Sequence, residues 1–412
     1  MTTYYSKHSL YVAIILAALL SMVADSSIAT EWKGREIEKD GLRHIINPGI
    51  PMEGVRDNTT ITSWRIGGDT ENDVLFGLID DVARDADGVS YLLDSQLSTV
   101  HVFSPEGDYL RSIGREGDGP GEFRSASDIM LLPNGTLCVL QLMPARAVLL
   151  TVDGAAAGDH PLPTYEDGGS AFLNGGSIAA GQIVLYMAKF FRKETSFGLQ
   201  TSFVRADSNG GITTTYWKLH QEVDMANVTF DEKGDAPPIW AVGTDGRFFI
   251  NNKWDAYYIE VIGSDGTSEY VIEREYEHFK RTPEDFKYIE SLQEADGMAP
   301  VTDVSETHRD VSRLLPRENG ELWVLSSRGK RDIQPNTIGK FDVFDRQGRY
   351  VRQVIINGPF VPGRDGFYIV GEFVYIVTNI GEFAGRDQDD SAAEDDTSSN
   401  EISVLCVKLN DM

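Results

Sequence analysis

The sequence predicts an all-β fold, a six-bladed β-propeller of four-stranded antiparallel blades, closed by an N-terminal strand and carrying one short helical insertion. Three observations predict it. A pattern of short strands recurs along the chain, and a glycine stands before the second strand of each recurrence. The last recurrence lacks one strand, and a spare strand precedes the first. A small sheet cannot bury both faces alone, and radial packing of several such sheets is typical of a propeller.

The first recurrence lies between Ile79 and Ile113. A short apolar run is followed by three runs of five or six residues, at 89–94, 98–103 and 109–113. These runs are rich in aromatic and β-branched residues, and Gly, Asp or Pro separates them. That pattern predicts a four-stranded antiparallel meander.

Glycines mark the later recurrences. Those predicted to open the second strands are Gly88, Gly135, Gly181, Gly246, Gly320 and Gly371. Those predicted in the turns between third and fourth strands are Gly107, Gly154, Gly210, Gly266 and Gly348. Glycine suits both positions because it accepts a positive φ without a steric penalty. The count gives six second strands but five complete units, and a seven-bladed ring with one irregular blade is the alternative.

The sixth unit has strands predicted at 366–370, 373–378 and 402–409, and its outer strand is missing. Residues 60–66 precede the first unit and have the composition of a spare fourth strand. Pairing the two would close the ring and remove two sheet edges at once. We therefore expect the propeller to span residues 60–412.

Two stretches carry a family pattern. Val102-Phe103 is followed by Gly107, and then by a link with Gly114, Gly117, Gly119, Pro120, Gly121, Glu122 and Phe123. Residues 341–350 repeat the first part of this pattern, whereas residues 188–198 depart from it. The chain resembles NHL-repeat six-bladed propellers in these features. The resemblance implies a fold and a binding role, and it does not imply a reaction.

Residues 1–29 have the pattern of a secretory signal peptide. A 15-residue apolar run ends at Ala24, and Ser27 and Ala29 are small residues before a cut at Thr30. The run is shorter than the roughly 20 residues of a membrane span, although an uncleaved anchor is the alternative. We expect an exported protein, periplasmic or extracellular, with no membrane span in the mature chain and an N-terminal arm at 30–59.

Two segments interrupt the repeat. Thr282 and Asp285 form a capping box around Pro283, which predicts a helical insertion at 282–296. This helix is either a strut on the rim or a lid over the central channel. Residues 382–401 include six acids in ten positions and no aromatic residue among those ten, which predicts a disordered acidic loop. Calcium binding there is the alternative to a solvated loop.

Charge and cysteine content exclude several classes. The chain has 37 Lys and Arg against 64 Asp and Glu, a net charge of −27, which disfavours binding to nucleic acid. Its two cysteines exclude a disulfide framework. Cys138 and Cys406 fall on different blades, and we expect both to be buried free thiols.

No catalytic motif is present. The seven histidines form no local zinc motif, and there is no nucleophile elbow or phosphate loop. We expect no cofactor, with calcium or another divalent metal as an alternative. The expected function is non-catalytic binding or scaffolding. The alternative is a metal-assisted hydrolase or lyase, similar to gluconolactonase, acting in the central channel.

Basic residues gather in the segments predicted on one face of the ring, here called the top face. These cations are either solvated loop charge or a surface that binds an anionic glycan, a small molecule or a carboxylate-bearing protein. The candidate ligand-binding residues are Arg115, Arg124, Arg146, Lys189, Arg192, Lys253, Trp254, Arg328 and Arg331.

Overall fold

The computed structural model describes residues 31–68, 74–164, 171–192, 197–223, 229–295, 301–380 and 401–410. The predicted signal peptide lies outside these residues, as does nearly all of the predicted acidic loop. The chain divides into two compact parts, Met1–Trp32 and Lys33–Met412. All of the described strands and helices belong to the second part.

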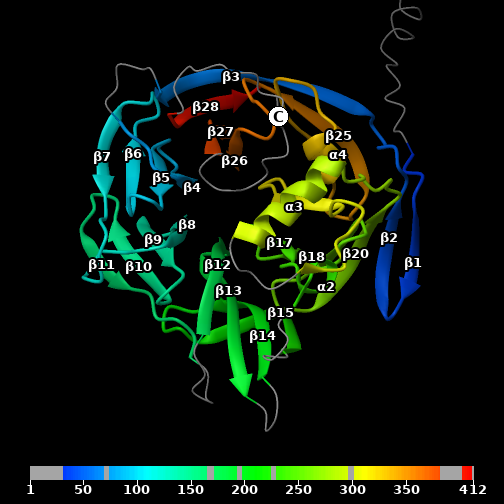
Figure 1. The fold of residues 1–412 in the computed structure, drawn as a ribbon, viewed down its shortest axis with the longest axis horizontal. Coiled ribbons are helices and arrows are strands. Elements are labelled where there is room, and N and C mark those ends of the chain that lie inside the picture. Colours follow the sequence, from blue (N-terminus) through cyan, green and yellow to red (C-terminus); the bar gives the residue numbers. More distant parts are fainter. Residues whose placement is uncertain are drawn as a thin grey trace, which may run out of the picture. The chain divides into compact units, whose positions relative to one another are not determined.

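Six antiparallel meanders make up most of the fold (Figure 1). Meander 1 has β4 (Ile79–Arg84), β5 (Ser90–Asp94), β6 (Thr99–Phe103) and β7 (Tyr109–Ile113). Meander 2 has β8 (Ala126–Leu131), β9 (Thr136–Gln141), β10 (Arg146–Thr151) and β11 (Ala156–Asp159). Meander 3 has β12 (Ala171–Ala179), β13 (Gln182–Arg192), β14 (Phe197–Ala206) and β15 (Ile212–Val223).

The other three meanders follow the same order. Meander 4 has β17 (Ile239–Val242), β18 (Phe248–Asn251), β19 (Tyr258–Ile262) and β20 (Ser268–Arg274). Meander 5 has β22 (Val311–Pro316), β23 (Leu322–Ser326), β24 (Thr337–Phe344) and β25 (Tyr350–Asn357). Meander 6 has β26 (Gly366–Val370), β27 (Phe373–Val377) and β28 (Ser403–Leu409). In Figure 1 the meanders follow one another around a centre, with their first strands innermost.

The turn glycines adopt the backbone conformation that the sequence predicts. Gly107 has φ +94°, and a Cβ there would lie 2.5 Å from Cγ of Trp64. All six glycines predicted before second strands also have positive φ. Glycine is therefore required at Gly107 by both the conformation and the close approach of the indole.

An N-terminal belt, defined here as β1 (Arg35–Lys39), β2 (Leu42–Asn47) and β3 (Val55–Gly67), runs along the outer strands of three meanders. β2 pairs in parallel with β20, and β1 pairs antiparallel with β2. The first half of β3 pairs in parallel with β25, and its second half pairs antiparallel with β28. Residues 60–66 thus pair with the last meander as predicted, whereas the strands in the predicted arm at 30–59 were not anticipated.

The belt is also fixed by a buried amide. Asn47 is wholly buried, and its Nδ2 donates a hydrogen bond to the backbone oxygen of Gly348 at 2.9 Å. Its Oδ1 accepts from the backbone N–H of Tyr350 at 2.8 Å. Because Gly348 and Tyr350 flank the last turn of meander 5, this one side chain ties β2 to the neighbouring sheet.

The apolar core lies between the faces of adjacent meanders. Val102 and Val139 belong to one buried cluster that joins meanders 1 and 2. Phe341 and Ile376 belong to another that joins meanders 5 and 6. Each meander therefore buries its faces against its neighbours, which is the packing expected for sheets that are unstable alone. Cys138 and Cys406 are buried free thiols, as predicted.

The helical insertion is present as α3 (Pro283–Ala295), which points toward the centre of the meanders in Figure 1. Its capping box is formed, since the Thr282 N–H donates to Asp285 at 2.5 Å and the Asp285 N–H donates to Oγ1 of Thr282 at 3.3 Å. Two further short helices, α2 (Glu232–Asp235) and α4 (Ser327–Arg331), correct the prediction of a single helical insertion.

The insertion is anchored by ion pairs. Arg281 precedes α3 and pairs with the largely buried Glu232 of α2 at 2.5 Å. The backbone N–H of Ser305, which follows α3, donates to the same carboxylate at 2.6 Å. A short parallel bridge between β16 (Phe230–Asp231) and β21 (Val301–Thr302) joins the same two segments. Both ends of the insertion are therefore held against the segment that joins meanders 3 and 4.

Candidate functional site

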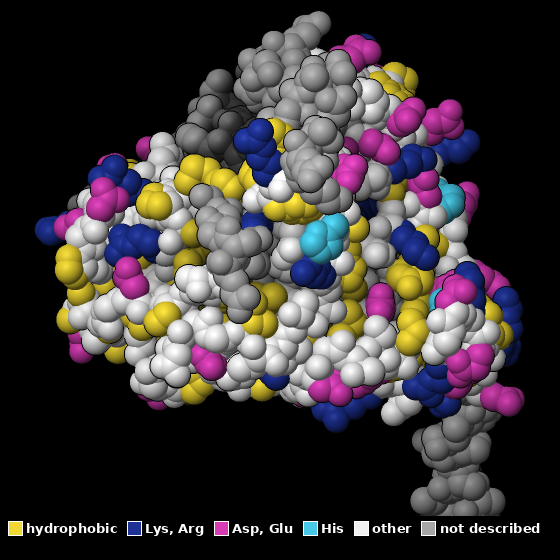
Figure 2. Space-filling model, turned by 90° about the horizontal axis from the view of Figure 1, so that it is seen from below, with side chains coloured by type: hydrophobic (Ala, Val, Ile, Leu, Met, Phe, Trp, Pro, Cys, Tyr) yellow, Lys and Arg dark blue, Asp and Glu magenta, His cyan; other side chains and the backbone are white. Residues whose placement is uncertain are grey.

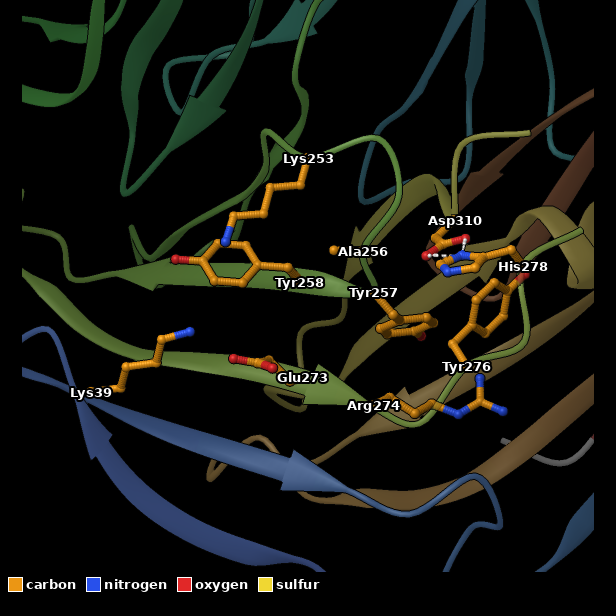
Figure 3. Close-up of a pocket in the computed structure, with 10 residues that line it drawn as sticks. All are labelled: Lys39, Lys253, Ala256, Tyr257, Tyr258, Glu273, Arg274, Tyr276, His278 and Asp310. Atoms are coloured by element: carbon orange, nitrogen blue, oxygen red, sulfur yellow. Dashed lines mark hydrogen bonds and ion pairs between the residues drawn. The ribbon is translucent and has the colours of Figure 1, made fainter. Parts of the chain in front are cut away.

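A pocket of about 220 Å³ opens where meander 4 meets the insertion (Figure 3). It lies at the loop after β18, along β19 and β20, and at the start of β22. Lys39 at the end of β1 adds a side chain from the belt. The lining residues are Lys39, Lys253, Ala256, Tyr257, Tyr258, Glu273, Arg274, Tyr276, His278 and Asp310.

A histidine and a buried carboxylate form one wall of the pocket. Nδ1 of His278 lies 2.9 Å and 3.0 Å from the two carboxylate oxygens of Asp310. Asp310 is wholly buried, whereas 47% of the His278 side chain is exposed. Burial raises the pKa of Asp310, and the hydrogen bond from His278 opposes that rise. Figure 3 shows the other ring nitrogen of His278 turned away from Asp310.

The insertion itself brings these two residues together. His278 precedes α3 and Asp310 follows it, and the chain leaves and returns as an antiparallel stem that pairs Lys280 with Thr307. Residues at the base of such a stem face each other although 32 positions separate them. The backbone N–H of Asp310 also donates to the oxygen of Trp254 at 3.1 Å, which joins the stem to the loop after β18.

Tyrosines form the floor of the pocket. The hydroxyl of Tyr257 donates to Asp342 at 3.0 Å, so it is committed to the interface between meanders 4 and 5. The hydroxyl of Tyr276 contacts Ser327 at 2.8 Å and accepts from the backbone N–H of Arg328 at 2.9 Å. Burial raises the pKa of Tyr258 to about 12, so its hydroxyl stays protonated at neutral pH.

Asp342 and Arg274 build the adjoining wall. Asp342 is wholly buried and accepts hydrogen bonds from Tyr257, Arg274, Tyr350 and Gln353. A carboxylate with four donors is satisfied, and this group therefore holds two sheets together. The Nε–H of Arg274 is buried and has no acceptor in the described part of the chain.

Two lysines supply the positive charge of the pocket. Nζ of Lys253 lies 3.7 Å from the ring centre of Tyr258, in a cation–π contact. Neither Lys253 nor Lys39 forms an ion pair with any of the described residues. Glu273 lines the same end of the pocket, and its carboxylate lies 2.5 Å from His44 of β2. The lysines are therefore the cations that a ligand can reach here.

The structure brings only one of the nine predicted site residues into this pocket, namely Lys253. Four others are paired with nearby carboxylates: Arg115 with Glu122, Arg124 with Asp118, Arg146 with Asp159, and Arg328 with Glu277. These arginines do not form a shared cationic surface, because each charge is offset locally.

Three of the remaining four residues lie on a strand or a helix rather than in the predicted loops, and Trp254 lies in the predicted loop after β18. Lys189 lies on β13 and is buried, which corrects its placement in an exposed loop. Arg192 ends the same strand, with its guanidinium 5.8 Å from the ring centre of Phe197. Trp254 donates from Nε1 to the backbone oxygen of Thr307 at 3.0 Å, so it supports the stem of the insertion. Arg331 ends α4 rather than lying in a loop.

Sequence reasoning missed His278, Asp310, Glu273, Tyr258 and Lys39. One signal was available for the first two, since they flank a recognisable helical insertion, and the two ends of an insertion must meet. No comparable signal exists for Lys39, because the pairing of β2 with β20 brings it to the pocket from the far end of the sequence.

A second set of polar groups lies on the innermost strands. Oδ2 of Asp81 on β4 accepts the backbone N–H of Ile129 on β8 at 3.0 Å. Asp128 on β8 accepts the backbone N–H of Gly176 on β12. These carboxylates therefore link neighbouring meanders. Among the described residues, no three or more His, Cys, Asp and Glu side chains are grouped so that they could hold a metal ion.

Within the described ranges, no helix has the length and apolar character needed to cross a membrane. A search of curated proteins finds no match to the sequence.

A family model described as a 6-bladed β-propeller matches residues 66–226. Among solved structures, a protein from Bacteroides vulgatus is 11% identical and aligns over 86% of this chain and 98% of its own, with a TM-score of 0.50. A Bacteroides fragilis protein named as exported is 14% identical and aligns over 87% of this chain and 100% of its own, with a TM-score of 0.47. A calcium-binding protein, regucalcin, from Agrobacterium tumefaciens is 10% identical and aligns over 86% of this chain and 96% of its own, with a TM-score of 0.43. The chain therefore has a β-propeller fold.

Proposed function

We propose that this protein is an exported binding protein that holds a carboxylate-bearing sugar or small molecule in the pocket of meander 4. One observation carries the proposal. Lys39 and Lys253 line a recessed, tyrosine-lined pocket without carboxylate partners in the described part of the chain. The net charge of −27 repels anions at long range, so local unpaired cations are what an anionic ligand requires.

The chemistry of the lining fits a sugar acid. Tyrosine rings offer flat apolar surfaces, and the lysines offer charge-assisted hydrogen bonds to a carboxylate. A recess that sets polar and charged side chains among three tyrosine rings offers the polar groups that orient a small ligand. Lys39 comes from the belt and Lys253 from meander 4, so a carboxylate held between them would link the two parts of the fold.

The proposal extends to the architecture and location of the chain. The six meanders are taken as six blades of an NHL-like ring, with β3 completing the sixth. The family model supports the blade number, and the pairing of β3 with β28 supports the closure. Export is supported by the signal-peptide pattern of residues 1–29.

The test is isothermal titration with D-glucuronate and D-galacturonate, using glucose and galactose as neutral controls. We expect uronates to bind and neutral sugars to bind much more weakly. Lys253→Gln and Lys39→Gln should each weaken uronate binding about 10- to 100-fold, as expected for the loss of a hydrogen bond to a charged group. Arg115→Gln is the matched control, because Arg115 is an exposed cation outside the pocket.

Wild-type protein that binds neither uronate, or that binds them equally well after both lysine substitutions, would show the proposed function to be wrong. Binding should also weaken with added salt, since the lysines are exposed and their charges are screened.

A further inference from the structure

Four histidines of the described residues contact carboxylates. The pairs are His44–Glu273, His101–Asp94, His278–Asp310 and His308–Asp285. In three pairs the imidazole is buried, with at most 10% of its side chain exposed. In the fourth pair the imidazole is accessible, since 47% of the His278 side chain is exposed in the wall of a pocket while Asp310 is wholly buried.

The carboxylates of these pairs also differ in the other hydrogen bonds that they accept. Asp94 accepts the backbone N–H groups of Gly77, Leu78 and Leu97, which makes it part of a loop scaffold. Asp285 completes the cap of α3. The carboxylate of Asp310 has no hydrogen-bond partner other than His278 in the described part of the chain. A buried carboxylate that bonds to one exposed imidazole can fix the orientation of that imidazole as a base.

The hydrogen bond defines the proton position on the ring. An ionised carboxylate only accepts hydrogen bonds, so Asp310 holds the proton of His278 on Nδ1. The lone pair of Nε2 is then available, and none of the described residues uses it. Lys253, Lys39 and Glu273 occupy the other end of the pocket in Figure 3, and Tyr276 lies beside the histidine.

We propose that His278, held by Asp310, is a general base that activates water to hydrolyse a carboxylic ester on an anionic ligand of this pocket. The inference rests on the proposed function, because Lys253 and Lys39 are taken to hold the anionic group of the same molecule. Asp310 is a positioning residue, since it acts through His278.

Water is the nucleophile because the pocket lining contains no serine, threonine or cysteine. The hydroxyls of Tyr257 and Tyr276 are committed to other residues, and the high pKa of Tyr258 keeps it protonated. An ester suits a single imidazole, since its leaving alkoxide needs less assistance than an amide nitrogen. A phosphate ester is disfavoured because its charge would face Asp310.

Nε2 of His278 takes a proton from water while the water oxygen bonds to the acyl carbon, and the carbonyl electron pair moves to oxygen. Collapse of this intermediate breaks the bond from the acyl carbon to the alcohol oxygen. The imidazolium returns its proton to that oxygen, and the products are an acid and an alcohol.

The experiment uses the full-length protein and two probes, mono-4-nitrophenyl glutarate and 4-nitrophenyl valerate. The probes have acyl chains of equal length, and only the first carries a carboxylate. We expect selective hydrolysis of the glutarate ester, with kcat/KM rising to a plateau as pH increases because the base must be unprotonated.

Variants separate catalysis from binding. His278→Gln should lower kcat about 10²- to 10⁴-fold and weaken uronate binding much less than Lys253→Gln does. Lys253→Gln should raise KM for the glutarate ester with little change in kcat. Asp310→Asn should lower kcat and shift the rising limb of the pH profile to lower pH, an effect that a purely structural role would not produce.

Controls keep these outcomes interpretable. His160→Gln should be silent, because His160 lies outside the pocket lining and its Nδ1 contacts the adjacent Pro161 oxygen at 2.8 Å. Added imidazole should restore part of the activity of His278→Ala. If the wild type binds uronates but hydrolyses neither ester above the buffer rate, or if His278→Gln matches it, the inference is wrong and the proposed function stands. If uronates do not bind at all, both are wrong.

Discussion

At the scale of single residues, side chains on the innermost strands reach across to the backbone of the next meander. Asp81 contacts Ile129, and Arg313 on β22 donates to the backbone oxygen of Phe367 on β26 at 2.8 Å. The hydroxyl of Tyr368 on β26 donates to the backbone oxygen of Ile79 on β4 at 2.9 Å. These hydrogen bonds fix neighbouring sheets where their inner edges converge.

Asp81 makes stability depend on pH. Burial, followed by the nearby carboxylate of Asp128, raises the pKa of Asp81 to about 7. Because the folded-state pKa exceeds the ordinary value of 3.8, the folded state favours the protonated form. The stabilisation is therefore full below about pH 4 and is lost as pH rises through about 7.

We expect Asp81→Asn to remove this dependence, since asparagine can accept the same backbone hydrogen bond but does not ionise. Its urea midpoint should match that of the wild type at about pH 3.5, where both forms are protonated, and exceed it at pH 8. Asp87→Asn, in an exposed turn, is the control. A constant difference between wild type and Asp81→Asn at all pH values would contradict the assigned titration.

At the scale of elements, the belt covers sheet edges that would otherwise be open. β20, β25 and β28 each gain a partner strand from the N-terminal region. Unpaired strand edges expose backbone donors and acceptors and promote aggregation. β1 then becomes an edge itself, but four of its five residues are charged, which discourages further pairing.

Two truncations distinguish the halves of the belt. Removing residues up to Gly67 deletes β3, and we expect aggregation or a much lower melting temperature because two meanders lose their shared strand. Removing residues up to Pro48 deletes only β1 and β2, and we expect a smaller loss. Differential scanning fluorimetry and size-exclusion chromatography measure both. If the protein that lacks residues up to Gly67 melts at the same temperature as the full-length protein, β3 does not stabilise the fold.

The meanders could be predicted from sequence because their signals are local. Glycine turns and alternating strands lie within each recurrence, and the second half of β3 was found by counting the strands of the last one. The parallel pairing of β2 with β20 could not be predicted, since parallel strands share no turn whose residues would mark the register.

The site was less predictable than the fold. Lys253 was found because a cation after a second strand is visible in the sequence. His278 and Asp310 were missed because their contact depends on the stem of the insertion, and the acids that neutralise Arg115 and Arg146 were missed because charge was counted by segment. Net charge of a segment does not show which cations are already paired.

At the scale of the whole molecule, the core protects its thiols. Burial raises the pKa of Cys138 to about 12 and that of Cys406 to about 11. The thiolate is the reactive form, and it is scarce at neutral pH in both cases. The two cysteines are therefore expected to behave as inert apolar residues while the protein is folded.

We expect a thiol reagent such as Ellman's reagent to label neither cysteine in native protein and both in urea. An Asp87→Cys variant, with its thiol in an exposed turn, provides the positive control and should label at once. Rapid labelling of the native wild type would mean that the faces of meanders 2 or 6 open readily.

The two-sided pairing of β3 has a consequence for the order of folding. Thr59 on β3 bonds to Asn410, which follows β28, across 351 positions of sequence. Contacts that close so long a loop are costly to form early, and chains rich in them fold slowly. β3 is synthesised early, and its second half therefore cannot pair with β28 until nearly the whole chain has been made. A ribosome or translocation pore that releases the chain from its N-terminus keeps β3 accessible to chaperones and proteases until β28 emerges.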